Sequence, residues 1–315
     1  MLNGSGLANM ATDICEAETR LGNNSIVCNT TDMSTWEKGM DGDVHVIHSH
    51  IPDKLSFSEK TKIVNVEHGA PEHVFEVSLH AGLTDSYGPS DPLALTIYLI
   101  RRADAVVTFW PRQAYIWKLM TRAPVHLIPM GVDTKFWTAV PKRKLLTGDP
   151  ALLTAENCHS CKWPIDLMLT WQYVANEYNN ARAHFLNIPY DQHRWWLPLS
   201  YSVGTQYTSF LSPNKLDKVQ LREFMCAADY YYNPVTYGDF NRIGLEAAAC
   251  GTKVISYTGN EYSHYWLTQT DQRVQVAELL KIFSGETKPR EAKKVPDITE
   301  TAEAMLKIYE EVLRK

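Results

Sequence analysis

The sequence predicts an α/β protein of two domains, each built on a parallel sheet with helices on both faces. Two observations predict this class. Short apolar runs alternate with longer amphipathic stretches, which is typical of buried parallel strands joined by helices. The alternation starts again at residue 151, after a polar segment, 141–150, that is basic and marked by Pro and Gly. We interpret that segment as the interdomain linker.

Strands and helices can be assigned in order along the first half. The predicted strands are residues 44–47, 62–66, 105–109 and 125–128, with helices at 92–102 and 112–122. Before them, residues 7–21 predict a helix and 25–29 a further strand. A domain of this type usually opens with an apolar strand, but only Met1 and Leu2 precede the glycine turn 3–6. The first strand is therefore expected to be short or partly missing.

The second half repeats the pattern. Its predicted strands are 151–155, 183–188, 229–232 and 253–257, and its predicted helices are 164–178, 218–228 and 243–250. A polar stretch, 285–297, then leads into an amphipathic helix at 298–315. We expect an N-terminal domain at 1–145, a second domain at 146–290, and a C-terminal segment, 291–315, whose helix packs back on the N-terminal domain.

Composition narrows the class of protein. The chain has 315 residues, 44% hydrophobic and 21% charged, with a formal charge of −5. This mildly acidic balance disfavours a general polyanion binder. We find no apolar run of transmembrane length and no signal-peptide pattern, and the six cysteines are scattered. We therefore expect a cytoplasmic protein.

The segment from Pro234 to Ile255 carries the most specific chemistry. It joins two predicted strands through a loop of small and polar residues and a helix that contains Glu246. Open α/β sheets bind ligands at the carboxyl ends of their strands, and a helix N-terminus offers free N–H groups to phosphate. Glu246 is expected on the first helical turn, where a carboxylate is favourable and could accept from ribose hydroxyls. An ordinary capped helix start is the structural alternative.

The same segment resembles the donor-binding signature of retaining GT-B glycosyltransferases, family 4 (glycosyl transferases group 1) in particular. The matching residues are Ala228-Asp229, Pro234, Asp239-Phe240, Leu245-Glu246-Ala247 and Ala249-Cys250-Gly251-Thr252. Further landmarks are Ala103-Asp104 and Ile128-Pro129-Met130-Gly131-Val132-Asp133. The resemblance implies two Rossmann-like domains facing a cleft, the GT-B arrangement.

Two positions depart from the signature. The first glutamate of the family falls on Gly238, so Asp239 is the expected replacement that contacts the donor sugar. The family's diphosphate-binding Arg and Lys fall on Asn157 and Lys162. A lysine alone still stabilises a leaving diphosphate, although it lacks the bidentate guanidinium.

Three histidines lie at the ends of predicted strands of the first domain: His48, His50 and His68. His68 matches a family histidine close to the donor and is a predicted catalytic residue. A zinc site built from the three is an alternative, but the resemblance implies no metal and we predict none. Cys158 and Cys161 form one C-x-x-C pair, which is half a zinc site and more typical of an ordinary loop.

The resemblance implies transfer of a hexose from a nucleoside-diphosphate sugar, UDP- or GDP-linked, to a hydroxyl acceptor with retention of configuration. The expected catalytic residues are His68, Lys162 and Asp239. The expected donor-binding residues are Gly4, Ser5, Gly6, Asn157, Phe240, Asn241, Arg242, Ile243 and Glu246. The aromatic cluster Tyr190, Trp195, Trp196 and Tyr201 is either an acceptor surface or core packing.

Alternatives to this function stay open. A degenerate protein that binds nucleotide sugars without catalysis would explain Gly238 and Asn157. A nucleotide-sugar epimerase has the same fold. No cofactor is expected beyond the donor, the acceptor is a glycan, a lipid-linked group or a small molecule, and a nucleic-acid acceptor is disfavoured by the acidic charge.

Overall fold

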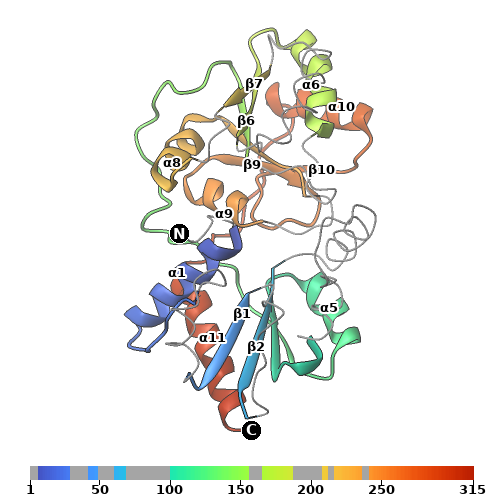
Figure 1. The fold of residues 1–315 in the computed structure, drawn as a ribbon. Helices are drawn as coiled ribbons and strands as arrows, with labels where there is room; N and C mark the ends of the chain where they lie inside the picture. Colours follow the sequence, from blue (N-terminus) through green and yellow to red (C-terminus); the bar gives the residue numbers. More distant parts are fainter. Residues whose placement is uncertain are drawn as a thin grey trace, which may run out of the picture. The chain divides into compact units, whose positions relative to one another are not determined.

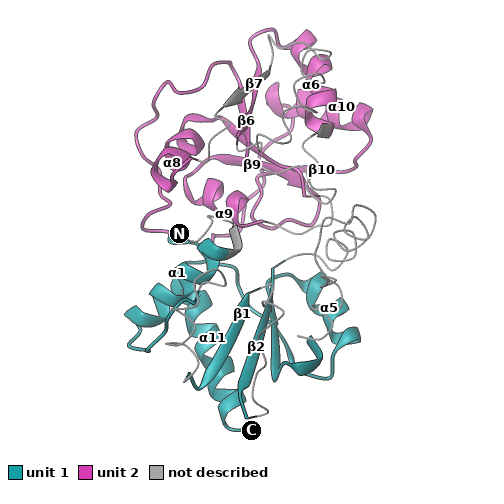
Figure 2. Ribbon diagram, viewed as in Figure 1, with its two compact units in different colours: residues 1–133, 296–315 teal, residues 134–295 magenta. Residues whose placement is uncertain are grey.

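The computed structural model describes residues 6–28, 42–48, 60–68, 100–155, 165–186, 208–211, 216–235 and 241–315. The chain divides into two compact units (Figure 2): unit 1 comprises residues 1–133 and 296–315, and unit 2 comprises residues 134–295. The basic segment that we interpreted as the interdomain linker lies within unit 2. Lys142 lies 2.6 Å from the carboxylate of Asp229, and Arg143 lies 2.8 Å from that of Glu223.

Unit 1 contains a sheet of parallel strands in chain order (Figure 1). These are β1 (Val44–His48), β2 (Lys62–Glu67), β3 (Ala105–Thr108) and β4 (Val125–Leu127). Ile63 and Val106 pack with Trp117 of helix α5 (Pro111–Met120), and all three side chains are buried. Two helices from distant parts of the sequence, α1 (Gly6–Arg20) and α11 (Ile298–Leu313), pack against one another.

The segment after α1 is not the strand that we predicted at 25–29. Its described residues, 25–28, have no regular structure. Polar groups here bond back to α1 instead of to a sheet: the Ser25 hydroxyl donates to Glu18 at 2.7 Å, and the Asn23 N–H donates to the Glu18 carbonyl at 3.1 Å. Glu18 also accepts from Tyr309 of α11 at 2.9 Å. Local side-chain bonding has therefore replaced strand pairing.

The start of α11 is fixed to the turn after β4. The Val132 N–H donates to the Pro296 carbonyl at 3.1 Å, and the Ile298 N–H donates to the Val132 carbonyl at 2.9 Å. Thr301 accepts from the Gly131 N–H at 2.8 Å. A side chain at Gly131 would collide with the Asp297 carbonyl, so this close approach requires glycine. The Ile-Pro-Met-Gly-Val-Asp landmark thus anchors the returning helix within unit 1.

Unit 2 contains a larger parallel sheet. Its strands are β5 (Ala151–Thr154), β6 (Arg182–Leu186), β7 (Thr208–Leu211), β8 (Tyr230–Asn233), β9 (Lys253–Tyr257) and β10 (Tyr265–Leu267). Its helices are α6 (Ile165–Glu177), α8 (Lys218–Ala227), α9 (Arg242–Ala249) and α10 (Gln272–Phe283). On one face, Leu152 and Tyr232 form a buried core with Trp171 of α6 and Leu279 of α10. Helix α9 packs against β8 and β9.

Most predicted strands and helices agree with the structure within two residues, but three elements of unit 2 were missed. β7 and β10 are short, with four and three residues, and no predicted strand covered them. α10 did carry a signal, since Val276, Leu279 and Leu280 recur at helical spacing after the N-cap Asp271.

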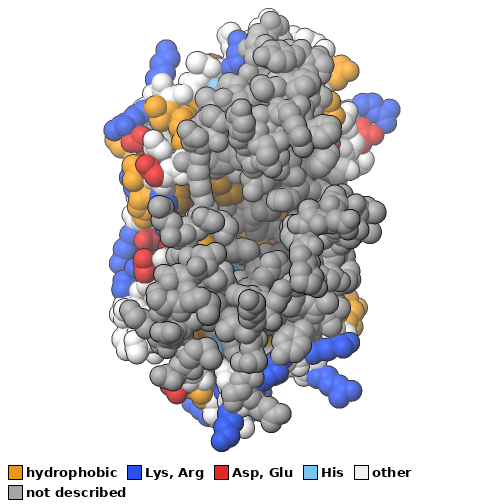
Figure 3. Space-filling model, in the orientation of Figure 1, with side chains coloured by type: hydrophobic (Ala, Val, Ile, Leu, Met, Phe, Trp, Pro, Cys, Tyr) orange, Lys and Arg blue, Asp and Glu red, His pale blue; other side chains and the backbone are white. Residues whose placement is uncertain are grey.

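The surface of the described residues shows no dominant charge patch on the face drawn in Figure 3. The described Lys and Arg side chains lie at several separate places, with Asp and Glu near some of them. Among the helices that the structure describes, none combines the length and apolar character needed to cross a bilayer.

Candidate functional site

The order of the strands in unit 2 identifies its candidate ligand site. Across the sheet the order is β10-β9-β8-β5-β6-β7, and every pair is parallel. The chain therefore runs outward from β5 in one direction, returns, and runs outward from β8 in the other. In open α/β sheets the crevice at the carboxyl ends of the two strands beside such a reversal is the usual ligand site. Here those strands are β5 and β8.

Helix α9 begins beyond the carboxyl end of β8. Asn241 is its N-cap, and the side-chain oxygen of Asn241 accepts from the Gly244 N–H at 3.1 Å. The first amides of an α-helix have no acceptor within the helix, and together with the macrodipole they favour an anion. The predicted donor-binding residues Asn241, Arg242 and Ile243 thus form the start of a helix beside the strand-order reversal.

Glu246 lies on the second turn of α9, not on the first as expected, because the helix begins at Arg242. Its Oε1 accepts from the Nε of Arg242 at 2.9 Å, and both side chains are nearly buried, with exposures of 10% for Arg242 and 9% for Glu246. The arginine needs a counterion here, since a cation at a helix N-terminus opposes the dipole. Glu246 supplies that counterion and is thereby held in one orientation.

The carboxyl end of α9 is fixed by the rest of the signature. Gly251 adopts a φ of +81°, the left-handed conformation that commonly ends a helix and favours glycine. Thr252 follows and donates its hydroxyl to the Met225 carbonyl of α8 at 2.6 Å. Burial raises the pKa of the Cys250 thiol far above its usual value, so this cysteine is an inert packing residue. The Cys-Gly-Thr part of the motif is therefore structural.

Two polar side chains at this edge have no hydrogen-bond partner among the described residues. Thr154 ends β5 and Asn233 ends β8, on either side of the strand-order reversal. Among the described residues, neither the Thr154 hydroxyl nor either amide atom of Asn233 has a hydrogen-bond partner. Sequence reasoning missed both residues, since polar groups at strand ends are common and their lack of partners is a property of the fold.

In unit 1, two of the predicted histidines come together at the carboxyl ends of β1 and β2. The Nδ1 of His48 lies 2.8 Å from the Nε2 of His68, so one ring must donate to the other. The His68 ring also lies beside Phe109, with ring centroids 5.4 Å apart. Burial lowers the pKa of His48 to about 4, which keeps that ring neutral at pH 7. The pair therefore fixes the orientation of His68.

The zinc alternative receives no support in the described part of the chain. No group of three or more His, Cys, Asp or Glu side chains there could hold a metal ion. The nitrogens by which His48 and His68 face each other are joined to one another by a hydrogen bond. His50 lies outside the described residues.

A second polar cluster lies at the same end of the unit 1 sheet. Glu67 accepts from the Asn65 amide at 2.7 Å, and Thr108 donates to Gln113 at 2.6 Å. Glu67 and Thr108 are neighbours in the register of β2 and β3, so they share a face of the sheet. Burial raises the pKa of Glu67 to about 7, although the bond from Asn65 opposes the shift. This carboxyl group can therefore exchange a proton near neutral pH.

Several predicted site residues lie outside the described residues: Gly4, Ser5, Asn157, Lys162, Asp239 and Phe240. So do Cys158 and Cys161, and the aromatic cluster of Tyr190, Trp195, Trp196 and Tyr201. Of the predicted glycine turn, Gly6 is the first residue of α1.

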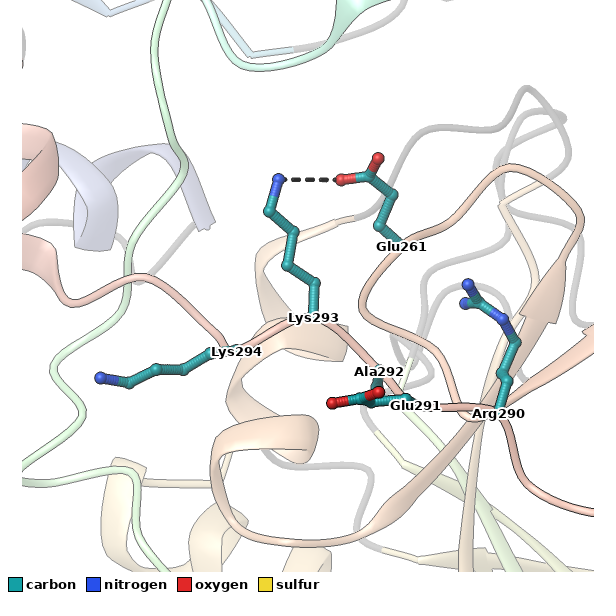
Figure 4. A pocket seen from close by; sticks show the side chains of 6 residues that line it. All are labelled: Glu261, Arg290, Glu291, Ala292, Lys293 and Lys294. Atoms are coloured by element: carbon teal, nitrogen blue, oxygen red, sulfur yellow. Dashed lines mark hydrogen bonds and ion pairs between the residues drawn. The ribbon is translucent and has the colours of Figure 1, made fainter.

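A shallow pocket of about 420 Å³ lies elsewhere in unit 2 (Figure 4). Its lining comprises Glu261, Arg290, Glu291, Ala292, Lys293 and Lys294. Arg290 stacks on Trp266 and donates to the carbonyls of Asn260 and Ser263, at 3.2 and 3.0 Å. Lys293 pairs with Glu261 at 3.0 Å. These cations hold loops together, so we assign the pocket no ligand.

Comparison with known proteins identifies the fold. No protein-family model matches the sequence, and no curated protein matches it either. Among solved structures, HepE of Anabaena in complex with UDP-glucose superposes with a TM-score of 0.58 at 14% identity, over 90% of this chain and 80% of HepE. The chain has the GT-B fold.

Other GT-B structures give the same result. The pneumococcal O-GlcNAc transferase GtfA, in complex with UDP and GlcNAc, superposes with a TM-score of 0.57 at 14% identity, over 82% of this chain. Sucrose-phosphate synthase from Thermosynechococcus elongatus gives 0.54 at 16% identity, over 80% of this chain. The chain covers 54% of GtfA and 65% of the synthase, so it spans about half to two thirds of their length. The predicted GT-B fold is confirmed.

Proposed function

We propose that this protein is a glycosyltransferase that moves a hexose from a nucleoside-diphosphate sugar to a hydroxyl acceptor with retention of configuration. The observation that carries the proposal is the strand-order reversal between β5 and β8, with the capped start of α9 beside it. Such an edge favours a phosphorylated nucleotide. The chain resembles in fold HepE bound to UDP-glucose and GtfA bound to UDP, and this likeness supports the choice of ligand.

The donor site is assigned to unit 2. The first amides of α9, at Arg242 and Ile243, bind the diphosphate, and Glu246 binds the ribose hydroxyls through its carboxylate, which Arg242 orients. We assign Lys162 to stabilise the leaving diphosphate, Asn157 to donor binding, and Asp239 and Phe240 to the donor sugar. Gly4, Ser5 and Gly6 are further proposed donor-binding residues.

The catalytic contribution of unit 1 is assigned to His68. The neutral His48 ring either accepts a hydrogen bond from the Nε2 of His68 or donates one to it. In both cases this bond fixes the orientation of the His68 ring and decides which of its nitrogens carries the proton. Since no protein nucleophile is assigned, the rate acceleration comes from positioning and from charge stabilisation of the leaving diphosphate. No metal is included in the proposal.

The test combines donor binding with product analysis. Purified protein is screened by thermal shift against UDP, GDP, UDP-glucose, UDP-GlcNAc and GDP-mannose, because a bound donor stabilises the fold by mass action. Turnover of the best donor is then followed with a panel of hydroxyl acceptors, and NMR gives the anomeric configuration of the product. Glu246→Ala and Lys162→Ala should each weaken donor binding or turnover. Unchanged donor affinity and turnover in both variants would refute the assignment.

The same experiment separates the alternatives. Tight binding of a donor without hydrolysis or transfer would indicate a non-catalytic binding protein, for which Gly238 and Asn157 would be the reason. Conversion of the donor to an epimer with no acceptor present would indicate an epimerase. A product with inverted anomeric configuration would still support a glycosyltransferase and would exclude only transfer with retention of configuration.

A further inference from the structure

The carboxamide of Asn233 is a buried polar group that has no partner within the described part of the chain. Asn233 is 0% exposed, and neither its Oδ1 nor its Nδ2 is hydrogen-bonded within the described structure. An unpaired polar group of this kind costs about 1–3 kcal/mol, and folded proteins contain few of them. An apolar side chain of similar size would avoid this cost. The position therefore carries a polar group for a reason other than stability of the isolated fold.

Asn233 occupies the position where a ligand is expected. It is the last residue of β8, one of the two strands beside the strand-order reversal, and it pairs in register with Ser256 of β9. Its neighbour Tyr232 faces the core formed with α6 and α10, so Asn233 points to the opposite face. None of the described residues of that core comes from α9, which packs on β8 and β9.

Two buried hydroxyl groups near Asn233 do have hydrogen-bond partners. Ser256, in the same row as Asn233, donates to the Tyr257 carbonyl at 3.2 Å, and Thr252 donates to Met225 at 2.6 Å. Among the described buried polar side chains on the strands of this sheet, those without a hydrogen-bond partner are Asn233 and, across the reversal, the 1% exposed Thr154. Leu152 belongs to the same core as Tyr232, so Thr154 lies on that face of the sheet, and Asn233 is the unpaired strand-end group on the opposite face.

We propose that Asn233 is a ligand-contact residue whose carboxamide binds two neighbouring hydroxyl groups of the sugar in the nucleotide-sugar donor. This proposal rests on the proposed function. The Oδ1 accepts from one hydroxyl and the Nδ2 donates to the next, a pattern that adjacent sugar hydroxyls satisfy. With the diphosphate at the start of α9, the end of β8 is close to the groups that the diphosphate carries. Asn233 then supplies polar contact that Gly238 cannot.

The experiment uses Asn233→Leu in the full chain, since leucine has a similar volume and no polar atom. Thermal unfolding of the ligand-free protein and calorimetric titration with UDP, UDP-glucose, GDP and GDP-mannose are measured. We expect an unchanged or higher Tm without ligand, because an unsatisfied amide has been removed. The affinity for the nucleotide sugar should fall about tenfold, the loss expected for one or two hydrogen bonds, while the affinity for the free nucleotide stays the same.

Two variants serve as controls. Ser256→Ala removes a hydrogen-bonded group from the same row, so it should lower the Tm without ligand and leave the ratio of sugar-nucleotide to nucleotide affinity unchanged. Thr154→Val removes the other unsatisfied group and should leave the Tm without ligand unchanged or higher.

Three results would overturn the proposal in distinct ways. A large fall in Tm for Asn233→Leu, with unchanged affinity for all four probes, would make Asn233 structural. An equal loss of affinity for the free nucleotide and for the nucleotide sugar would show that Asn233 contacts the nucleotide and not the sugar. If the unmodified protein binds none of the four probes, the proposed function itself fails, a result that does not depend on the variant.

Discussion

Arg242 and Glu246 form an ion pair of 2.9 Å that lies almost entirely out of solvent, one helical turn apart on α9. The pair joins the predicted phosphate-binding start of the helix to the predicted ribose-binding carboxylate. Removing either partner would leave a buried charge unmatched, whereas removing both would not. The two residues are therefore expected to act as one unit in stability and in binding.

Replacing only one residue of the Arg242–Glu246 pair should strongly destabilise the fold. Arg242→Leu is expected to lower the free energy of unfolding by about 3–5 kcal/mol, and the double variant Arg242→Leu/Glu246→Leu should recover much of that loss. Urea denaturation measures both. The control is Glu310→Ala, which breaks an exposed pair with Arg314 at the same spacing and should cost no more than about 0.5 kcal/mol. Equal losses of unfolding free energy in the single and the double variant would contradict the expected coupling between Arg242 and Glu246.

Changing the N-cap of α9 should separate helix stability from anion binding. Asn241→Asp keeps a side-chain acceptor for the Gly244 N–H, so the free energy of unfolding should change by less than about 0.5 kcal/mol. The added negative charge should weaken binding of UDP by about tenfold, because it would lie beside the diphosphate. Isothermal titration measures the affinity. The matched change Asp271→Asn, at the N-cap of α10, should leave UDP binding unchanged.

The raised pKa of Glu67 predicts a pH dependence of stability. Because its pKa rises from 4.5 in the unfolded chain to about 7 in the fold, the protonated group favours the folded state. That stability is complete below pH 4.5 and is lost as pH rises through 7, by roughly 3 kcal/mol in total. Glu67→Gln, which preserves the acceptor for Asn65, should therefore stabilise the protein at pH 8 and have little effect at pH 4.5. Urea denaturation across this range tests the sign.

His48 titrates with the opposite sign. Its pKa falls from 6.5 to about 4 in the fold, so the neutral ring favours the folded state. Its contribution is present above pH 6.5 and is lost as pH falls through 4. The variant His48→Gln should retain more of its pH 7 stability at pH 4 than the unmodified protein does, and nitrogen NMR of the His68 ring should show a changed tautomer ratio. An unchanged His68 spectrum would show that His48 does not orient that ring.

Gly131→Ala should destabilise unit 1. The added methyl group would meet the backbone carbonyl of Asp297, which cannot rotate away as a side chain could. The expected loss is about 1–3 kcal/mol. Gly22→Ala is the comparison, since a Cβ there meets open space and the cost comes only from its φ of +90°. A loss at Gly131 no larger than that at Gly22 would show that the chain can adjust around the turn.

Sequence periodicity was sufficient for most of the fold but not for all of the site. β9 was predicted with its observed bounds, because Val254, Ile255 and Tyr257 give it the mostly apolar character of a buried strand in a parallel sheet. The helix start at Arg242 was placed one residue late, which put Glu246 on the wrong turn and concealed the pair of residues four apart. His48 and His68 were both identified, yet only the register of β1 with β2 brings them together.

Other parts of the site depend on what the fold leaves unpaired. Asn233 and Thr154 look like ordinary strand ends in the sequence, and Glu67 looks like an ordinary exposed carboxylate. Their burial follows from the packing of neighbouring strands and helices, and their missing or limited partners follow from the positions of all surrounding polar groups. No local pattern of residues encodes either property.

The return of residues 296–315 to unit 1 has a consequence for synthesis. Unit 2 is one continuous stretch, 134–295, so all of its residues have been made before α11 emerges from the ribosome. Unit 1 lacks the helix that packs on α1, and Thr301, which anchors the turn at Gly131, until α11 (Ile298–Leu313) has been translated. The later part of the chain can therefore fold first, and the earlier part is the last to close its core.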